Sequence, residues 1–174
     1  MSLPIFLIGA RGCGKTTIGH RLSQTLGYAF RDTDHHLQNV RCISIAQIVA
    51  DQGWDAFRTM EAESLQQVTA PSSIIATGGG IILRPENCQF MRDNGRVVWL
   101  NVEPDELARR LIVDPEAEQR PTLTGRPISE EMSDILTVRR PLYSSAAHHI
   151  VDAARTPDAV VDDILQILRQ QQAG

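Results

Sequence analysis

The chain has 174 residues, which fits one ordinary domain, and 42% of them are hydrophobic, which is enough for a buried core. Its net charge of −4 and pI of about 5.7 disfavour binding to duplex nucleic acid, because no basic surplus is available to displace counterions. No apolar run approaches the roughly 18 residues that predict a membrane span. Three scattered cysteines, Cys13, Cys42 and Cys88, lack metal-site spacing and favour a reducing, cytoplasmic environment.

Strand and helix patterns alternate along the chain. The first apolar run ends in glycine, as expected for a strand buried on both faces of a parallel sheet. Such an alternation implies an α/β fold with right-handed crossovers. The predicted strands cover residues 3–8, 29–31, 73–77, 96–100 and 150–151. The predicted helices cover 17–26, Ser44 to Gly53, Asp55 (as N-cap) through Leu65, 85–94, Pro104 through Leu111, Ser129 to about 147, and a terminal segment from Pro157.

One segment breaks this alternation. Residues 114–127 are polar, contain three prolines and lie between two predicted helices. A long connection of this kind in a compact domain is usually functional or disordered. A plain surface loop is the alternative interpretation and stays open on these grounds.

Residues 9–16, with the sequence GARGCGKT, match the phosphate-binding pattern G-x-x-x-x-G-K-[ST] between a predicted strand and a predicted helix. Glycines let backbone N–H groups converge on phosphate oxygens, and the helix N-terminus adds partial positive charge. Lys15, the single lysine among 17 basic residues, can reach the β- and γ-phosphates, and the Thr16 hydroxyl can ligate Mg²⁺. The predicted ATP-binding residues here are Gly12, Cys13, Gly14, Lys15, Thr16 and Thr17, with Lys15 also catalytic.

The phosphate loop identifies a nucleotide but not the acceptor. A GTPase would need the base-reading motif N-K-x-D. This chain cannot contain that motif, because its single lysine is already part of the phosphate loop. The apolar strand at 73–77 runs into three glycines instead of the aspartate that many P-loop ATPases place there. The acid for the metal is therefore expected from Asp32 or Asp34. If strand geometry persists through them, both side chains leave the same face, while helix capping is the alternative role for either one.

Six motifs follow one another in register along the chain. They are the phosphate loop, DTD at 32–34, FRTME at 57–61, ATGGG at 76–80, RPTL at 120–123 and RRPLY at 139–143. Together they resemble the shikimate kinase family over essentially the whole chain. The resemblance implies transfer of the γ-phosphoryl of ATP to the 3-hydroxyl of shikimate, in the pathway to aromatic amino acids. It also implies a three-layer P-loop kinase fold: a five-stranded parallel sheet of order 2-3-1-4-5, flanked by helices, with a mobile lid at about 112–126.

The resemblance further implies roles for individual residues. Arg120, in the lid, matches a position that contacts ATP. Asp32 matches the residue that holds Mg²⁺ through water, and Asp34 the residue that hydrogen-bonds the shikimate hydroxyls. The remaining positions that match substrate-binding residues are Arg58, Gly79 and Arg139.

The chemistry of the acceptor agrees with these roles. A carboxylate is best held by planar guanidinium groups, which Arg58 and Arg139 can supply. Backbone N–H groups of Gly79 and Gly80 can approach a ligand closely because no Cβ intervenes. Asp34 is assigned as catalytic because it can accept the hydroxyl proton, although a loose transition state does not demand an early base. Lys15, Mg²⁺ and Arg120 would neutralise charge in that transition state, and Arg155 is expected beside the adenine.

Two other interpretations stay open. A kinase for gluconate or for a nucleoside monophosphate would use similar arginines. Only the motifs at 32–34 and 57–61 therefore distinguish a shikimate kinase from such an enzyme. A non-catalytic, nucleotide-dependent regulator would have no need to keep Lys15, Asp34 and Arg120 together. We expect one domain over 1–174, a monomer with shikimate and ATP as ligands and Mg²⁺ as cofactor, and no nucleic-acid or membrane partner.

Overall fold

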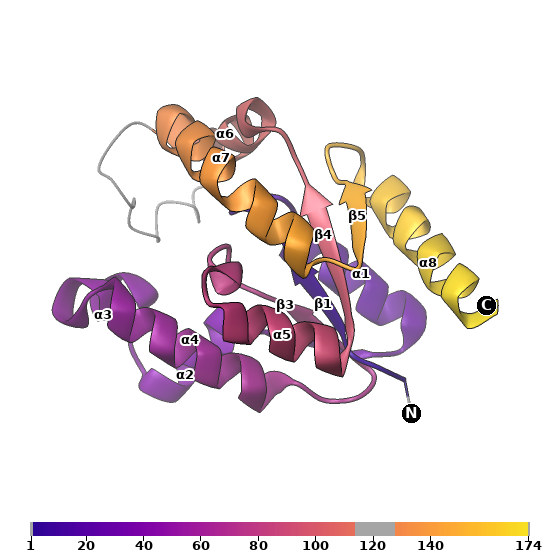
Figure 1. Cartoon of the computed structure of the whole chain (residues 1–174), viewed down its shortest axis with the longest axis horizontal. Coiled ribbons are helices and arrows are strands. Elements are labelled where there is room, and N and C mark those ends of the chain that lie inside the picture. The colour runs from indigo at the N-terminus through magenta and orange to yellow at the C-terminus, as the bar shows by residue number, and fades with distance from the viewer. Residues whose placement is uncertain (1, 114–127, 174) are drawn as a thin grey trace.

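The computed structural model describes residues 2–113 and 128–173, with side chains described for 2–110 and 133–170. Five parallel strands form one sheet in the order β2-β3-β1-β4-β5, with helices on both faces (Figure 1). The predicted fold class and strand order are confirmed. The strands are β1 Ile5–Ile8, β2 Ala29–Asp32, β3 Ser73–Ala76, β4 Arg96–Asn101 and β5 His149–Asp152. The helices are α1 Lys15–Leu26, α2 Thr33–Arg41, α3 Ile45–Gln52, α4 Trp54–Val68, η1 Ile81–Leu83, α5 Pro85–Asn94, α6 Pro104–Val113, α7 Ile128–Ala146 and α8 Pro157–Ala173.

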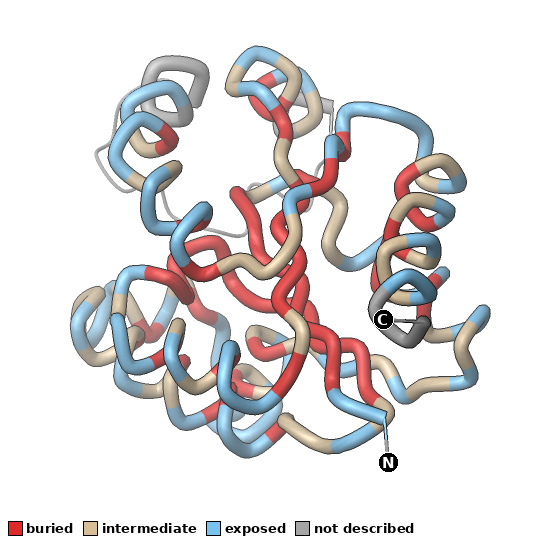
Figure 2. The backbone as a smooth tube through the Cα atoms, turned by 45° about the vertical axis from the view of Figure 1, so that its right-hand side comes forward, coloured by how far each residue is buried: buried red, intermediate tan, exposed pale blue. Residues whose placement is uncertain are grey.

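Strand β1 lies at the centre of the sheet and of the core. All four of its residues are buried, and Phe6 faces Ile75 of β3 and Val97 of β4 in register. Helices α1 and α8 lie on one side of the sheet, and α5 and α7 on the other (Figure 1). The three central strands β3, β1 and β4 are accordingly the most continuously buried part of the sheet, whereas the edge strands β2 and β5 are partly exposed (Figure 2). A strand covered on both faces has no polar side, which is why β1 is apolar throughout.

Local signals set several helix ends as the sequence predicts. Ser44 caps α3, because its hydroxyl accepts a hydrogen bond from the N–H of Gln47 at 3.1 Å. Pro85 occupies the first turn of α5, where a missing N–H costs nothing. Thr156 caps α8 through the N–H of Ala159 at 3.3 Å. In the described part of the chain, no helix combines the length and hydrophobicity that crossing a membrane needs.

The region after β2 differs from the prediction. Strand geometry ends at Asp32, and the unpredicted helix α2 begins at Thr33. The Asp32 carboxylate caps this helix, accepting from the N–H groups of Asp34 at 2.9 Å and His35 at 3.1 Å. The expectation that Asp32 and Asp34 leave one face of a strand is therefore wrong, because Asp34 already lies in the first turn of a helix.

One smaller prediction fails, and one short element was not predicted. Helix α4 begins at Trp54 with Gly53 as its N-cap, so Asp55 lies inside the first turn instead of capping it. The 3-10 turn η1 after the glycines was not predicted. The predicted lid lies outside the described residues apart from its first two positions, and Arg120 lies outside them as well.

Candidate active site

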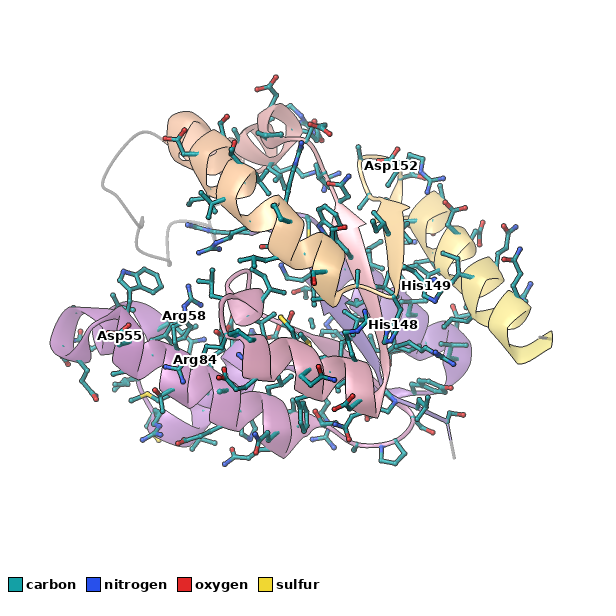
Figure 3. The ribbon with its side chains drawn as sticks, in the orientation of Figure 1. Asp55, Arg58, Arg84, His148, His149 and Asp152 are labelled. Atoms are coloured by element: carbon teal, nitrogen blue, oxygen red, sulfur yellow. The ribbon has the colours of Figure 1, made fainter. Side chains whose placement is uncertain are left out.

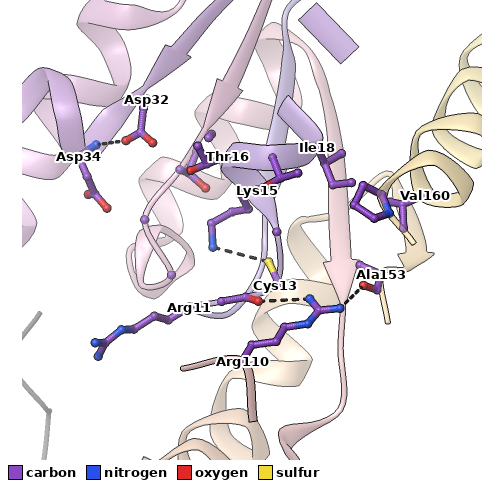
Figure 4. Close-up of a pocket in the computed structure, with 18 of the residues that line it drawn as sticks. Arg11, Cys13, Lys15, Thr16, Ile18, Asp32, Asp34, Arg110, Ala153 and Val160 are labelled. Carbon is purple, nitrogen blue, oxygen red and sulfur yellow. Dashed lines mark hydrogen bonds between the residues drawn. The ribbon is translucent and has the colours of Figure 1, made fainter. Parts of the chain in front are cut away.

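A cavity of about 790 Å³ opens at the carboxyl ends of the central strands (Figure 4). This edge of a parallel sheet is where α/β proteins place their ligands. The cavity brings together predicted residues from the phosphate loop, the start of α2, the glycines after β3 and the loop after β5. Those lining it are Gly12, Cys13, Gly14, Lys15, Thr16, Thr17, Asp32, Asp34, Gly79 and Arg155.

The phosphate loop takes its shape from glycines in conformations that other residues avoid. Gly9 has φ of +149°, and a Cβ there would lie 2.8 Å from the carbonyl oxygen of Leu100. Gly14, with φ of +103°, is the N-cap of α1. The chain can therefore leave β1, turn back over the sheet edge and enter α1 within a few residues. The N-terminus of α1, with its partial positive charge, consequently lies at the cavity.

Lys15 holds this loop together. Its ammonium group donates to the carbonyl oxygens of Gly9 at 2.6 Å and Ala10 at 3.1 Å, and lies 3.7 Å from the Cys13 sulfur. Cys13 is buried, and its own N–H donates to Ala10 at 3.1 Å. The Cys13 side chain thus belongs to the underside of the loop, while Lys15 provides a cation at the cavity wall (Figure 4).

Thr16 and Asp32 both line the cavity and carry oxygen atoms that can ligate a metal. Mg²⁺ prefers oxygen ligands and keeps several waters, so one or two protein oxygens beside the phosphates suffice. The cap on α2 uses only Oδ1 of Asp32. The residues present therefore fit Mg²⁺. Among the described residues, no group of three or more His, Cys, Asp or Glu side chains could hold a metal by itself.

Two carboxylates approach the loop after β3 from different helices, Asp34 from α2 and Glu61 from α4. A Cβ on Gly78 would lie 2.5 Å from Oε2 of Glu61 and 3.1 Å from Oδ1 of Asp34. Only a glycine leaves room for both carboxylates here. Asp34 is half-buried and lines the cavity, whereas Glu61 is 1% exposed and lies behind the loop.

Arg58 lies next to this pair. Its guanidinium forms an ion pair with Glu61 at 3.1 Å and lies 5.2 Å from the ring centre of Trp54. A Cβ on Gly80 would overlap the guanidinium, so Gly80 allows the arginine to pack against the loop. Figure 3 shows Arg58 projecting from α4 toward η1. A guanidinium held by both a carboxylate and a ring is fixed in orientation, which favours planar recognition of an anion.

Cations surround the buried Glu61 carboxylate. Burial raises its pKa above the ordinary value, while the charges of Arg58, Arg139 and Lys15 act in the opposite direction. Arg139 of α7 is thus near enough for its charge to act on Glu61, although it does not line the described cavity. With Asp34 included, three cations stand against two carboxylates, and the net positive charge suits an anionic acceptor.

Asp34, Arg58, Glu61 and the glycines at 78–80 form an acceptor cluster, which lies beside the phosphate loop. A Cβ on Gly79 would lie 3.4 Å from the N of Arg11 and 3.7 Å from the O of Gly9. The glycines after β3 therefore form a wall that has the phosphate loop on one side and Glu61 and Arg58 on the other. Such contact is what transfer between two bound ligands requires, because the reacting atoms must come within about 3.5 Å.

Two arginines lie at the far end of the cavity, near the loop after β5. Arg110 of α6 donates to the carbonyl oxygens of Gly12 at 3.2 Å and Ala153 at 3.0 Å (Figure 4). Arg155 pairs with Asp163 and donates to the Asp152 carbonyl oxygen. Arg110 was not predicted, and its sequence pattern resembles an ordinary surface pair with Glu106.

Glu61 was also missed as a site residue. It lies inside the motif FRTME at 57–61, three residues after Arg58, a spacing that places both on one helix face. That spacing was the available signal. Its burial, which makes the pair important, comes from the packing of α4 against the glycine loop and could not be read from the pattern.

The comparisons with known proteins agree with this geometry. A model of the family "Shikimate kinase" matches residues 11–169. The chain is 58% identical to Shikimate kinase 2 of Erwinia tasmaniensis over 100% of both chains. It is 52% identical to Shikimate kinase 2 of Pectobacterium atrosepticum, over 97% of this chain and 98% of that protein. A solved structure, shikimate kinase from Acinetobacter baumannii in complex with shikimate, superposes with a TM-score of 0.91 at 31% identity, covering 100% of this chain and 97% of that one. The chain belongs to the shikimate kinase family.

Proposed function

We propose that this protein transfers the γ-phosphoryl of ATP to the 3-hydroxyl of shikimate, giving shikimate 3-phosphate and ADP on the way to aromatic amino acids. The observation that carries the proposal is the close approach of the phosphate loop to the acceptor cluster around the glycines after β3. Full-length identity to proteins named shikimate kinase 2, and the likeness to a shikimate-bound structure, support it.

Shikimate is a small carboxylate with three hydroxyls, and the site has residues suited to bind the carboxylate and residues suited to bind the hydroxyls. Arg58 and Arg139 would bind the carboxylate, since guanidinium groups suit it in charge and geometry. Asp34 would accept hydrogen bonds from hydroxyls, and the N–H groups of Gly79 and Gly80 would complete the pocket. Glu61 and Trp54 would hold Arg58 in place through the contacts described above.

Catalysis would rest on positioning and charge neutralisation. Phosphoryl transfer passes through a loose transition state with charge spread over the transferring oxygens. Lys15 would leave the loop carbonyls to meet that charge, and Arg120 would approach it from the lid. Asp34 would take the hydroxyl proton late in the transfer. Mg²⁺, when bound by Thr16 and Asp32, supplies further neutralisation of the phosphates.

An assay of ADP release with a panel of acceptors tests the proposal. We expect release with shikimate and little above background with gluconate or a nucleoside monophosphate. A preference for gluconate or a nucleoside monophosphate would show that the protein is another small-molecule kinase. Nucleotide binding without ADP release would show that it is a regulator.

Two further measurements test the predicted cofactor and oligomeric state. Omission of Mg²⁺ should abolish ADP release. Sedimentation of the protein, with and without both substrates, would test the predicted monomer.

A further inference from the structure

Tyr143 of α7 is fully buried and makes a hydrogen bond to the acceptor cluster. Its hydroxyl donates to the carbonyl oxygen of Gly79 at 2.5 Å. Its ring stacks on Trp99 of β4, with 5.5 Å between ring centres and 20° between planes. Phenylalanine has the same ring and would fill this part of the core equally well. The hydroxyl is therefore the feature that links this side chain to the site.

The carbonyl that Tyr143 holds belongs to the wall between donor and acceptor. Gly79 packs on the phosphate loop, and its neighbours pack on the acceptor residues: Gly78 on Asp34 and Glu61, Gly80 on Arg58. A shift of the Gly79 carbonyl would therefore move these glycines relative to the phosphate loop and relative to the acceptor residues Asp34, Glu61 and Arg58.

Burial raises the pKa of Tyr143 above its ordinary value, and the charge of Arg139, one turn earlier on α7, acts in the opposite direction. The phenol thus keeps its proton and can donate it to the Gly79 carbonyl. Helix α7 therefore carries both Arg139 and the group that holds the loop after β3.

We propose that Tyr143 is a positioning residue for phosphoryl transfer, whose hydroxyl fixes the Gly78–Gly80 loop to helix α7, the helix that carries Arg139. It contacts no reacting atom and acts through the loop it holds. The role rests on the proposed function, in which Arg139 and this loop bind the acceptor. A ring that only fills the core is the competing explanation, and it predicts an effect on stability but none on acceptor binding.

Tyr143→Phe removes the hydroxyl and keeps the ring on Trp99. We expect the KM for shikimate to rise about tenfold, which corresponds to the loss of one net hydrogen bond. The KM for ATP should stay within about twofold. Without any ligand, amide hydrogen exchange in residues 78–83 should become faster, because the Gly79 carbonyl loses its donor. Tyr28→Phe is the matched control, since Tyr28 is the only other tyrosine and packs on the main core away from the cavity.

An unchanged KM for shikimate in Tyr143→Phe would overturn the inference, as would equal rises in both KM values. A lower melting temperature with unchanged KM values would assign the residue to the core alone. If the wild type itself failed to phosphorylate shikimate, the proposed function would fall. The exchange measurement would then still decide the inference, because unaltered exchange across residues 78–83 shows that the hydroxyl does not hold the loop.

Discussion

The donor and acceptor sides of the site are built in different ways. The donor side is one continuous segment, residues 9–16, whose shape comes from backbone glycines and from Lys15 bonded to two loop carbonyls. The acceptor side is assembled from α2, α4, the loop after β3 and α7. Its side chains are positioned by one another, as Arg58 is by Glu61 and Trp54.

This difference predicts different consequences of substitution. Changes on the donor side should lower turnover, because the loop and its lysine act on the transferring phosphoryl. Changes on the acceptor side should mainly alter the KM for the acceptor, because they move or discharge groups that bind it. The two classes can be separated by measuring kcat and both KM values for each variant.

Replacing Lys15 with Met should have the largest effect. The change removes the cation aimed at the transferring phosphoryl, and we expect turnover to fall by about a thousandfold or more, equivalent to about 4 kcal/mol. The loop should also rearrange, because the carbonyls of Gly9 and Ala10 lose their donor. Lys15→Arg is the control that keeps the charge. Turnover near the wild-type value in Lys15→Met would contradict the assignment of the phosphate loop.

Asp34→Asn should act on the acceptor with a smaller effect. Loss of a charge-assisted hydrogen bond costs about 1.5–3 kcal/mol, so shikimate binding should weaken by roughly ten- to a hundredfold while ATP binding changes little. Calorimetric titration with each ligand would measure both affinities.

Asp32→Asn is the matched variant on the donor side. Asparagine also caps helices well, so α2 should keep its stability while the carboxylate charge is lost. The Mg²⁺ concentration needed for activity should rise. If Asp34→Asn shifted the Mg²⁺ requirement and Asp32→Asn weakened shikimate binding, the two roles would be reversed.

Gly80→Ala tests how the acceptor side is packed. The new Cβ would overlap the Arg58 guanidinium and force it away from its ion pair with the buried Glu61, so some loss of stability is also expected. The displaced arginine should raise the KM for shikimate by roughly tenfold. Gly79→Ala is the comparison, since its Cβ would meet the backbone N of Arg11 at 3.4 Å and leave Arg58 in place. An unchanged KM for shikimate in Gly80→Ala would show that the position of Arg58 does not depend on the loop.

Much of the fold and most of the donor side could be predicted because the signals are local. An apolar run buried on both faces identifies β1, and the phosphate loop is a contiguous pattern with a physical reason for each glycine. The order of the strands came from the family resemblance, since alternation alone implies only a parallel sheet.

The rest depends on tertiary contacts that leave a weak trace in the sequence. Helix α2 has Leu37 as its one fully buried apolar residue, and the Asp32 cap and packing on α4 stabilise it. Arg110 has the spacing of a surface ion pair, and only the fold brings it to Gly12. Tyr143 reads as an ordinary core aromatic, because nothing in its pattern indicates a bond to a loop far back in the chain.

The smallest expected effect concerns the stability of the acceptor side and its pH dependence. The pKa of Glu61 is raised by burial in the folded protein, above the ordinary value of 4.5 that it would have in the unfolded chain. Folding therefore favours the protonated carboxyl. Its contribution to stability is fully present below pH 4.5 and is lost as the pH rises through the higher folded pKa.

Glu61→Gln removes this titration, because the amide is neutral at every pH. The stability of the wild type relative to Glu61→Gln should consequently fall as the pH rises from about 4 to 8. Urea unfolding at several pH values in that range would measure the difference. Glu63→Gln, on the same helix but exposed, controls for the change in helix propensity. A stability difference that grew in favour of the wild type with rising pH would mean that Arg58, Arg139 and Lys15 outweigh burial at Glu61. The acceptor side would then be stabilised by its charges in the absence of substrate, and Arg58 would be held by attraction to Glu61 more than by packing on Gly80.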